Sequence, residues 1–145
     1  MKNNYYNEIK NKLIDNEVYK KVKDYSKNRN DLSTYYEVGK LLIKAQGGEG
    51  RAKYGDNLIK EYYERLFNDT GRKYNITALK RIRQFYLVVE KGVPLAHQLT
   101  WSHYTEILSL SNINEINYSI NITEEYNLSV RELRERLKKK NIKYY

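Results

Sequence analysis

Two amphipathic stretches joined by a short turn make up residues 56–90, DNLIKEYYERLFNDTGRKYNITALKRIRQFYLVVE. Apolar side chains recur at three- and four-residue steps on both sides of the turn, and this spacing predicts helices over residues 56–68 and 76–90. Asp56 has the side chain of a helix N-cap, and we expect it to begin the first helix. A glycine-containing turn followed by a basic second helix has the outline of a helix-turn-helix unit.

The second of these helices separates apolar from polar side chains. At about 100° per residue, its apolar residues gather on the side that would anchor it to the rest of the domain. These residues are Ile76, Leu79, Ile82, Tyr86 and Val89. Thr77, Lys80, Arg81 and Gln84 gather on the opposite side. Arg83 falls nearer the apolar side, and we expect it to be structural and to pair with a carboxylate.

The polar side has the chemistry of a DNA-reading surface. Lysine and arginine reach guanine O6 and N7 or phosphates, glutamine pairs with adenine, and a helix N-terminus holds a phosphate. Residues of the turn and of an upstream glycine-rich loop would add phosphate contacts. The expected DNA-binding residues are Arg51, Arg72, Lys73, Asn75, Thr77, Lys80, Arg81 and Gln84. The alternative for this face is an ordinary solvated basic surface.

The residues before this unit also have helical spacing. Apolar side chains recur at helical steps over residues 4–27 and 31–46, which form either one bent helix or two. Asp31 or Ser33 is the expected N-cap of the second stretch. The loop at 47–55, GGEGRAKYG, begins with two glycines, and we expect Gly47 or Gly48 to take positive φ and end the helix. It has neither P-loop spacing nor a preceding strand, so we interpret it as a hinge.

The last third of the chain has clear capping signals. Thr100 is the expected cap of a helix over residues 101–110, and a weaker helix is expected over 112–126. Ser129, with a glutamate three residues later, forms a capping box for a last helix over 130–140. The sequence therefore predicts an all-α fold, a single helical domain of about six or seven helices that contains the helix-turn-helix unit.

A strongly basic balance indicates a polyanionic partner. The 145-residue chain has 27 Lys and Arg against 18 Asp and Glu, a formal net charge of +9. Nucleic acid, and double-stranded DNA in particular, is the first partner that this charge suits. An acidic protein is the second and an anionic membrane surface the third. A solubilising charge with no specific partner is the alternative.

Residue content excludes several kinds of site. Cysteine is absent, which excludes disulfides, thiolate chemistry and cysteine-based metal sites. His97 and His103 have no third metal-ligand type nearby, and we expect His103 to pack or to hydrogen bond. The glutamates make no acid–base pair, so we expect no metal, no cofactor and no enzymatic activity. We find no membrane-spanning stretch and no secretory signal, and we expect a cytoplasmic protein.

Five short motifs follow one another along the chain. They are YYEVG at 35–39, RAKYG at 51–55, LKRIRQFY at 79–86, LTWSHY at 99–104 and LSVREL at 128–133. In this order they resemble the N-terminal domain of the YhcG-like family, bacterial proteins whose C-terminal half is a PD-(D/E)xK nuclease domain. The resemblance implies a helix-turn-helix DNA-binding region at about 56–90. Within a single domain over 1–145, residues 1–30 would form an N-terminal helical extension and residues 31–140 the family domain.

A looser likeness appears over residues 99–133, whose pattern LTWSHYTEILSL…NLSVREL is similar to the helical DNA-binding domain of ParB-type partition proteins. Both resemblances imply a recognition helix at 76–90. The chain departs from the YhcG-like pattern at Tyr36 and Leu128, where Trp is usual. It departs again at 74–75, where Tyr-Asn replaces a Gly-Phe-Ser type of turn.

The nuclease domain of that family would begin at about the point where this chain ends. Glu8-Ile9-Lys10 matches the nuclease catalytic arm locally, but it lies in a helical stretch with no partner Asp before it. We therefore expect the DNA-targeting module of a nuclease-associated defence or mobile-element system, without catalytic activity of its own. The alternative is a protein-binding inhibitor or adaptor, of anti-restriction or anti-CRISPR type, that acts on a nuclease partner. The ParB likeness adds homodimerisation as an expectation.

Overall fold

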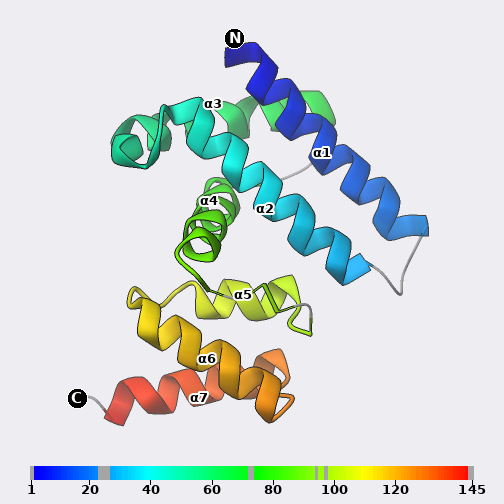
Figure 1. The fold of residues 1–145 in the computed structure, drawn as a ribbon. Helices are drawn as coiled ribbons and strands as arrows, with labels where there is room; N and C mark the ends of the chain where they lie inside the picture. Colours follow the sequence, from blue (N-terminus) through cyan, green and yellow to red (C-terminus); the bar gives the residue numbers. More distant parts are fainter. Residues whose placement is uncertain (1, 23–26, 72–73, 94, 97, 144–145) are drawn as a thin grey trace. The chain divides into compact units, whose positions relative to one another are not determined.

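Seven α-helices and one short 3₁₀ helix occur in the part of the chain that the computed structural model describes, residues 2–22, 27–71, 74–93, 95–96 and 98–143 (Figure 1). In chain order they are α1 (Lys2–Val22), α2 (Lys27–Gln46), η2 (Glu49–Arg51), α3 (Ala52–Thr70), α4 (Ile76–Glu90), α5 (Trp101–Ile107), α6 (Ile113–Glu125) and α7 (Val130–Lys143). These ranges contain no strand. The predicted all-α fold of six or seven helices is confirmed.

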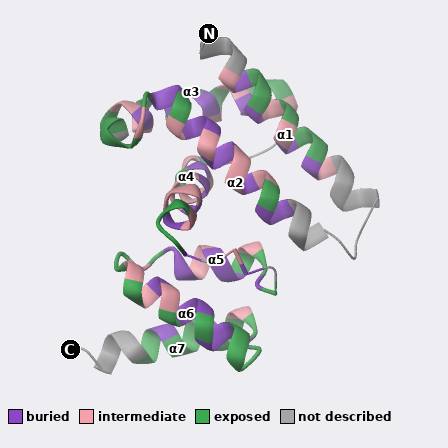
Figure 2. Cartoon of the chain, in the orientation of Figure 1, coloured by how far each residue is buried: buried purple, intermediate pink, exposed green. Residues whose placement is uncertain are grey.

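The chain divides into two compact units, Met1–Leu87 and Val88–Tyr145. The first contains α1, α2, α3 and most of α4, and the second contains α5, α6 and α7. Buried residues form stripes along the helices of each unit (Figure 2). The expectation of one domain over 1–145, with residues 1–30 as an extension, stays a prediction.

In the first unit, α1 and α2 pack side by side (Figure 1). Tyr6, Ile9 and Leu13 of α1 are at most 1% exposed, and their three- and four-residue steps make one apolar stripe. Asn16 continues this stripe and donates a hydrogen bond from Nδ2 to Oδ1 of Asp31 on α2, at 2.9 Å. Both of these polar side chains are buried, so the bond satisfies groups that would be costly to leave unpaired.

Two expected helix caps in this region were wrong. α2 begins at Lys27, so Asp31 and Ser33 lie inside the helix and cap nothing. Asp31 turns its carboxylate toward α1 because Asn16 offers a buried donor there. The end of α2 agrees with expectation, since Gly47 and Gly48 have φ of 94° and 110°, conformations that glycine adopts without steric cost.

A close approach of backbones joins α2 to α4. Gly39 lies in the middle of α2, and a Cβ added there would come within 2.5 Å of the carbonyl oxygen of Ile82 and 2.6 Å of Cβ of Tyr86. Leu79, Ile82 and Phe85 of α4 are at most 2% exposed, so this helix is anchored through a fully buried seam. The absence of a side chain at position 39 lets the two helices meet at this distance.

In the second unit, His103 joins the start of α5 to the turn between α6 and α7. Oγ1 of Thr100 accepts from the backbone N–H of His103, and Nδ1 of His103 accepts from the backbone N–H of Thr100, which makes a capping box. Nε2 of the same ring then carries the proton and donates to the carbonyl of Leu128 at 2.8 Å. The expected cap at Thr100 and the expected hydrogen-bonding role of His103 are both confirmed, although α5 ends at Ile107.

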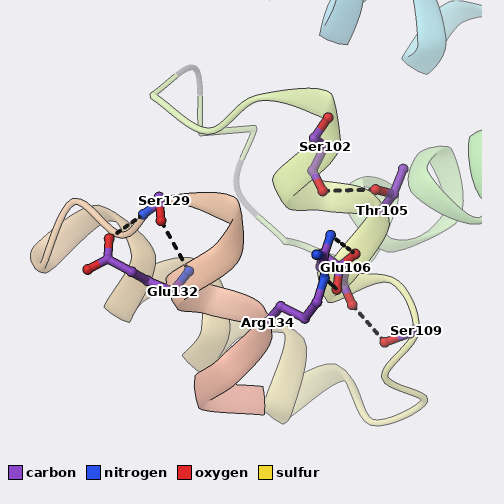
Figure 3. Close-up of polar contacts among 7 residues, drawn as sticks. All are labelled: Ser102, Thr105, Glu106, Ser109, Ser129, Glu132 and Arg134. Atoms are coloured by element: carbon purple, nitrogen blue, oxygen red, sulfur yellow. Dashed lines mark hydrogen bonds and ion pairs between the residues drawn. The ribbon is translucent and has the colours of Figure 1, made fainter. Parts of the chain in front are cut away.

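A second capping box lies at the start of α7, and an ion pair joins α7 to α5 (Figure 3). Ser129 and Glu132 bond each other's backbone N–H groups at 3.1 and 2.9 Å, as expected. The bond from the Ser129 backbone N–H lowers the pKa of the Glu132 carboxyl. Arg134 of α7 donates to both carboxylate oxygens of Glu106 on α5, each at 3.1 Å (Figure 3). These bonds attach α7 to α5.

Replacing Gly39 with alanine tests the close approach of α2 and α4. An alanine in a helix interior normally stabilises it by about 1 kcal/mol relative to glycine. Here the added methyl would meet backbone of α4, and overpacking of this kind costs about 1–3 kcal/mol. We expect Gly39→Ala to lower the free energy of unfolding, measured by urea denaturation followed by circular dichroism. Gly50→Ala is the control, because a Cβ at that position meets no atom within 4 Å. A Gly39→Ala protein as stable as this control would contradict the description.

Candidate nucleic-acid interface

The turn before α4 has a glycine at the end of α3 and a capping asparagine at the start of α4. α3 ends at Thr70, and Gly71 takes a φ of 66° while its N–H donates to the carbonyl of Phe67. Asn75 accepts the N–H of Ala78 on its side-chain oxygen at 2.7 Å, so it caps α4. Its expected contact with a phosphate stays a prediction. Arg72 and Lys73, two of the expected phosphate contacts, lie outside the described residues.

Helix α1 bonds to both ends of this turn. The Tyr6 hydroxyl donates to Oδ2 of Asp69 at 2.6 Å, and this bond lowers the pKa of the Asp69 carboxyl. Lys10 lies 3.7 Å from the same carboxylate oxygen. On the other side of the turn, the Tyr74 hydroxyl donates to Oε1 of Glu17 at 3.1 Å. The path of the chain into α4 is therefore fixed by polar side chains of α1.

The polar side of α4 is open to solvent over its first two turns. Thr77 and Lys80 are exposed, with 46% of the Lys80 side chain accessible. Arg81 and Gln84 are half-buried, and Nη1 of Arg81 donates to Oε1 of Gln84 at 3.0 Å. Because helical neighbours three residues apart lie side by side, this bond holds a guanidinium and a carboxamide together on the surface.

The buried side of α4 differs in part from the expected one. Leu79 and Ile82 are buried as expected, and Phe85 joins them with 0% exposure. The other expected anchors, Ile76, Tyr86 and Val89, are only half-buried. Tyr86 is displaced to the edge of the seam because α2 passes so close at Gly39, and its ring packs on that of Tyr36 at 5.2 Å.

Arg83 holds α4 to the start of α3 and the end of α2. Its side chain is only 13% exposed, and Nη2 donates to Oδ1 of Asp56 at 2.7 Å. Nη1 donates to Oε1 of Gln46 at 3.0 Å, and Gln46 in turn donates to the carbonyl of Gly48 at 2.8 Å. The expected pairing of Arg83 with a carboxylate is confirmed. A nearly buried guanidinium with these partners fixes three segments relative to one another.

Asp56 does not cap a helix, and the expectation that it would was wrong. α3 begins at Ala52, so Asp56 lies in its second turn, where its carboxylate meets Arg83. The hydrogen bond from Arg83 lowers the pKa of the Asp56 carboxyl, and the charge of Lys80 acts in the same direction. Gly55 leaves the space for this arrangement, since any Cβ there would collide with the amide of Gln46 and the guanidinium of Arg83.

The remaining expected contact, Arg51, lies at the end of η2 beside the start of α3. It is exposed, and its guanidinium lies 4.7 Å from the centre of the Tyr54 ring, a cation–π contact. Nζ of Lys80 lies 3.9 Å from Oδ2 of Asp56, so the beginning of α3 lies against the polar side of α4. Arg51 of η2 and Lys80 of α4 therefore both contact the first two turns of α3, at Tyr54 and Asp56.

Two other kinds of feature are absent from the described ranges. These ranges contain no group of three or more His, Asp or Glu side chains that could hold a metal ion. None of the described helices is both long enough and apolar enough to cross a lipid bilayer.

The Arg83–Asp56 bond predicts a pH-dependent stability. A carboxyl whose pKa is lowered on folding stabilises the folded state above its unfolded pKa of about 3.9, and this stabilisation is lost as the pH falls through the folded pKa. We expect Asp56→Asn to cost about 1–2 kcal/mol at pH 7, because it removes the charge that a nearly buried arginine faces across a half-exposed pair. The difference from the wild type should shrink below about pH 4.

Urea denaturation of both proteins across this pH range measures the difference. In an Arg83→Gln background the same substitution loses only the half-exposed contact with Lys80, so its effect should be smaller at pH 7. If Arg83 is present and the wild type and Asp56→Asn differ in unfolding free energy by the same amount at every pH, the carboxylate charge plays no part.

Comparison with known proteins supplies a family. The sequence matches the family described as the DUF1016 N-terminal domain over residues 8–143. It is also 39% identical over 56 residues to a protein of Escherichia coli (strain K12) named "Putative nuclease YhcG". That segment is 38% of this chain and 15% of the Escherichia coli protein, so the chain corresponds to a small part of that relative. No solved structure matches the chain. The match over residues 8–143 establishes that this chain belongs to the DUF1016 N-terminal domain family, as the YhcG-like motifs implied.

Proposed function

We propose that the chain binds double-stranded DNA through the polar side of α4, as the DNA-targeting module of a nuclease-associated system. The observation that carries the proposal is the arrangement of α4 itself. One side of the helix is anchored by fully buried residues, and the other presents Lys80, Arg81 and Gln84 beside the exposed Thr77. A recognition helix needs both properties, since the anchor fixes the register in which the polar side meets base edges.

Affinity would come mainly from charge. A net charge of +9 favours encounter with a polyanion, and each phosphate that a cation neutralises releases counterions. Base reading would come from Arg81 and Gln84. Their side chains are bonded to each other at 3.0 Å, and a carboxamide beside a guanidinium combines the donor and acceptor groups that pair with the edges of adenine and guanine. The pair would thus reach the bases already oriented.

The nuclease association rests on kinship. The family is that of an N-terminal domain, and the related Escherichia coli protein carries the word nuclease in its name. We propose that DNA cleavage belongs to another part of such proteins and that this domain has no catalytic activity of its own. The one segment with a local match to the nuclease arm, residues 8–10, has Lys10 engaged with Asp69 and the Tyr6 ring.

Fluorescence anisotropy with a labelled duplex tests the proposal. The wild type should bind with a steep salt dependence. The variant Lys80→Ala/Arg81→Ala/Gln84→Ala should bind at least about tenfold more weakly, and the slope of log K against log salt should fall by about 2, because two phosphate-binding cations are lost. The variant should keep its fold, since Arg83 and its partners are untouched and both members of the Arg81–Gln84 bond are removed together.

Lys60→Ala/Lys91→Ala is the matched control, because it removes the same charge from two exposed positions away from Thr77–Gln84. It should weaken duplex binding less than the α4 variant. Equal losses in the two variants would mean that net charge, and not the α4 surface, determines binding. Absence of duplex binding by the wild type at low salt would reject the DNA proposal in favour of a protein partner for the basic side.

A further inference from the structure

The second unit exposes an aromatic ring next to a basic helix. Tyr126, the residue after α6, is 57% exposed, more than any other large apolar or aromatic residue that the described ranges contain. The guanidinium carbon of Arg136 on α7 lies 5.1 Å from the centre of its ring. Exposed apolar surface costs about 25 cal/mol per Å² relative to burial. The arginine holds this exposed ring in place through a cation–π contact.

Most of the charged residues of α7 are engaged within the unit. Arg134 is bidentate with Glu106, and Arg131 lies 3.8 Å from Glu135. Glu132 closes the capping box at the start of the helix. Over residues 130–139, the charged side chains outside these pairs are Arg136, Lys138 and Lys139. All three are exposed, Arg136 contacts the Tyr126 ring, and Lys139 follows Arg136 by about one turn on the neighbouring side of α7.

Acidic residues also lie near the ring or its arginine. Glu124 lies near Tyr104, where it adds to the burial that raises the pKa of that tyrosine to about 12. Glu125 is exposed at the end of α6, and Glu132 interacts with the charge of Arg136. The charges around Tyr126 are therefore mixed, and the exposed ring beside a guanidinium is the feature that distinguishes this place.

We infer that Tyr126, Arg136 and Lys139 form a binding site for single-stranded nucleic acid. An unpaired base would stack on the tyrosine ring, and the cations would bind the phosphates beside it, the combination by which proteins hold single strands without reading sequence. A duplex keeps its bases stacked inside and gains little from an exposed ring. An acidic peptide would use the cations but has no flat π-face to place on the tyrosine. The inference is independent of the duplex-binding proposal for α4.

Anisotropy titrations of the full chain with two probes test this site. The probes are a labelled oligothymidylate of about 12 nucleotides, within the usual span of single-strand sites, and a labelled duplex. Tyr126→Ala should weaken binding of the single strand about tenfold, the loss typical of one stacked base, and leave duplex binding within about twofold. Arg136→Ala should weaken binding of the single strand as well. Arg136→Lys should recover only part of that affinity, because lysine keeps the positive charge but lacks the planar guanidinium.

Tyr118→Ala is the matched control, since Tyr118 is another exposed tyrosine of α6, at 50%. It should leave binding of both probes unchanged. Circular dichroism should give the same helical signal for all variants, because the substituted side chains are exposed. The inference is overturned if Tyr126→Ala and Tyr118→Ala bind the single strand alike. It is also overturned if a labelled poly-glutamate peptide binds as tightly as the oligonucleotide and loses as much affinity in Tyr126→Ala. The α4 proposal is judged on the duplex probe, so either proposal can fail alone.

Discussion

The guanidinium of Arg83 is the interaction on which the first unit depends. It bonds Asp56 of α3 and Gln46 of α2, so it fixes α4 against the beginning of one helix and the end of another. A nearly buried arginine is tolerated only when its donors have partners, and here a carboxylate and an amide supply them. A side chain at Gly55 would displace these groups, because an added Cβ would collide with the Gln46 amide and the Arg83 guanidinium. The hinge after α2, the start of α3 and the orientation of α4 are therefore parts of one arrangement.

This arrangement determines which residues of α4 reach solvent. Gly39 brings α2 against the backbone of α4 and buries Phe85, while α1 holds both ends of the preceding turn through Tyr6 and Tyr74. Because one side of α4 is held in this way, Lys80 and the Arg81–Gln84 pair remain on the opposite side of the helix. In the second unit, ion pairs engage Arg131 and Arg134 of α7, while Arg136 lies over the ring of the exposed Tyr126. We thus propose two surfaces with different chemistry, one suited to a duplex and one to an unpaired base.

Local signals in the sequence predicted the helices and several of their ends. The caps at Thr100 and Ser129 were predictable because a capping box involves residues only three apart. The pairing of Arg83 followed from its position near the apolar side of a helix. Its partner did not, because Asp56 is 27 residues away and has the appearance of an N-cap. Asp31 was misread for the same reason, since the donor that turns it inward, Asn16, comes from another helix.

Sequence periodicity predicted which residues form the polar side of α4, but not which residues of other helices lie beside it. The contact of Lys80 with Asp56, the role of Asn75 as a cap and the burial of Phe85 all depend on how helices cross. The crossing of α2 and α4 depends in turn on Gly39, which ends the YYEVG motif at 35–39, but the motif does not show which helix packs against it. Tyr126 was overlooked because a tyrosine at a helix end has no sequence signature, and only the arginine placed over its ring distinguishes it.

Nuclear magnetic resonance titration of the isotope-labelled chain with a duplex tests the central claim most directly, because it reports every backbone amide without a substitution. The account predicts that the largest chemical-shift changes fall on Thr77, Lys80, Arg81 and Gln84, while the amides of the buried Ile9 and Leu13 on α1 change little. Changes confined to other helices, with α4 unaffected, would contradict it.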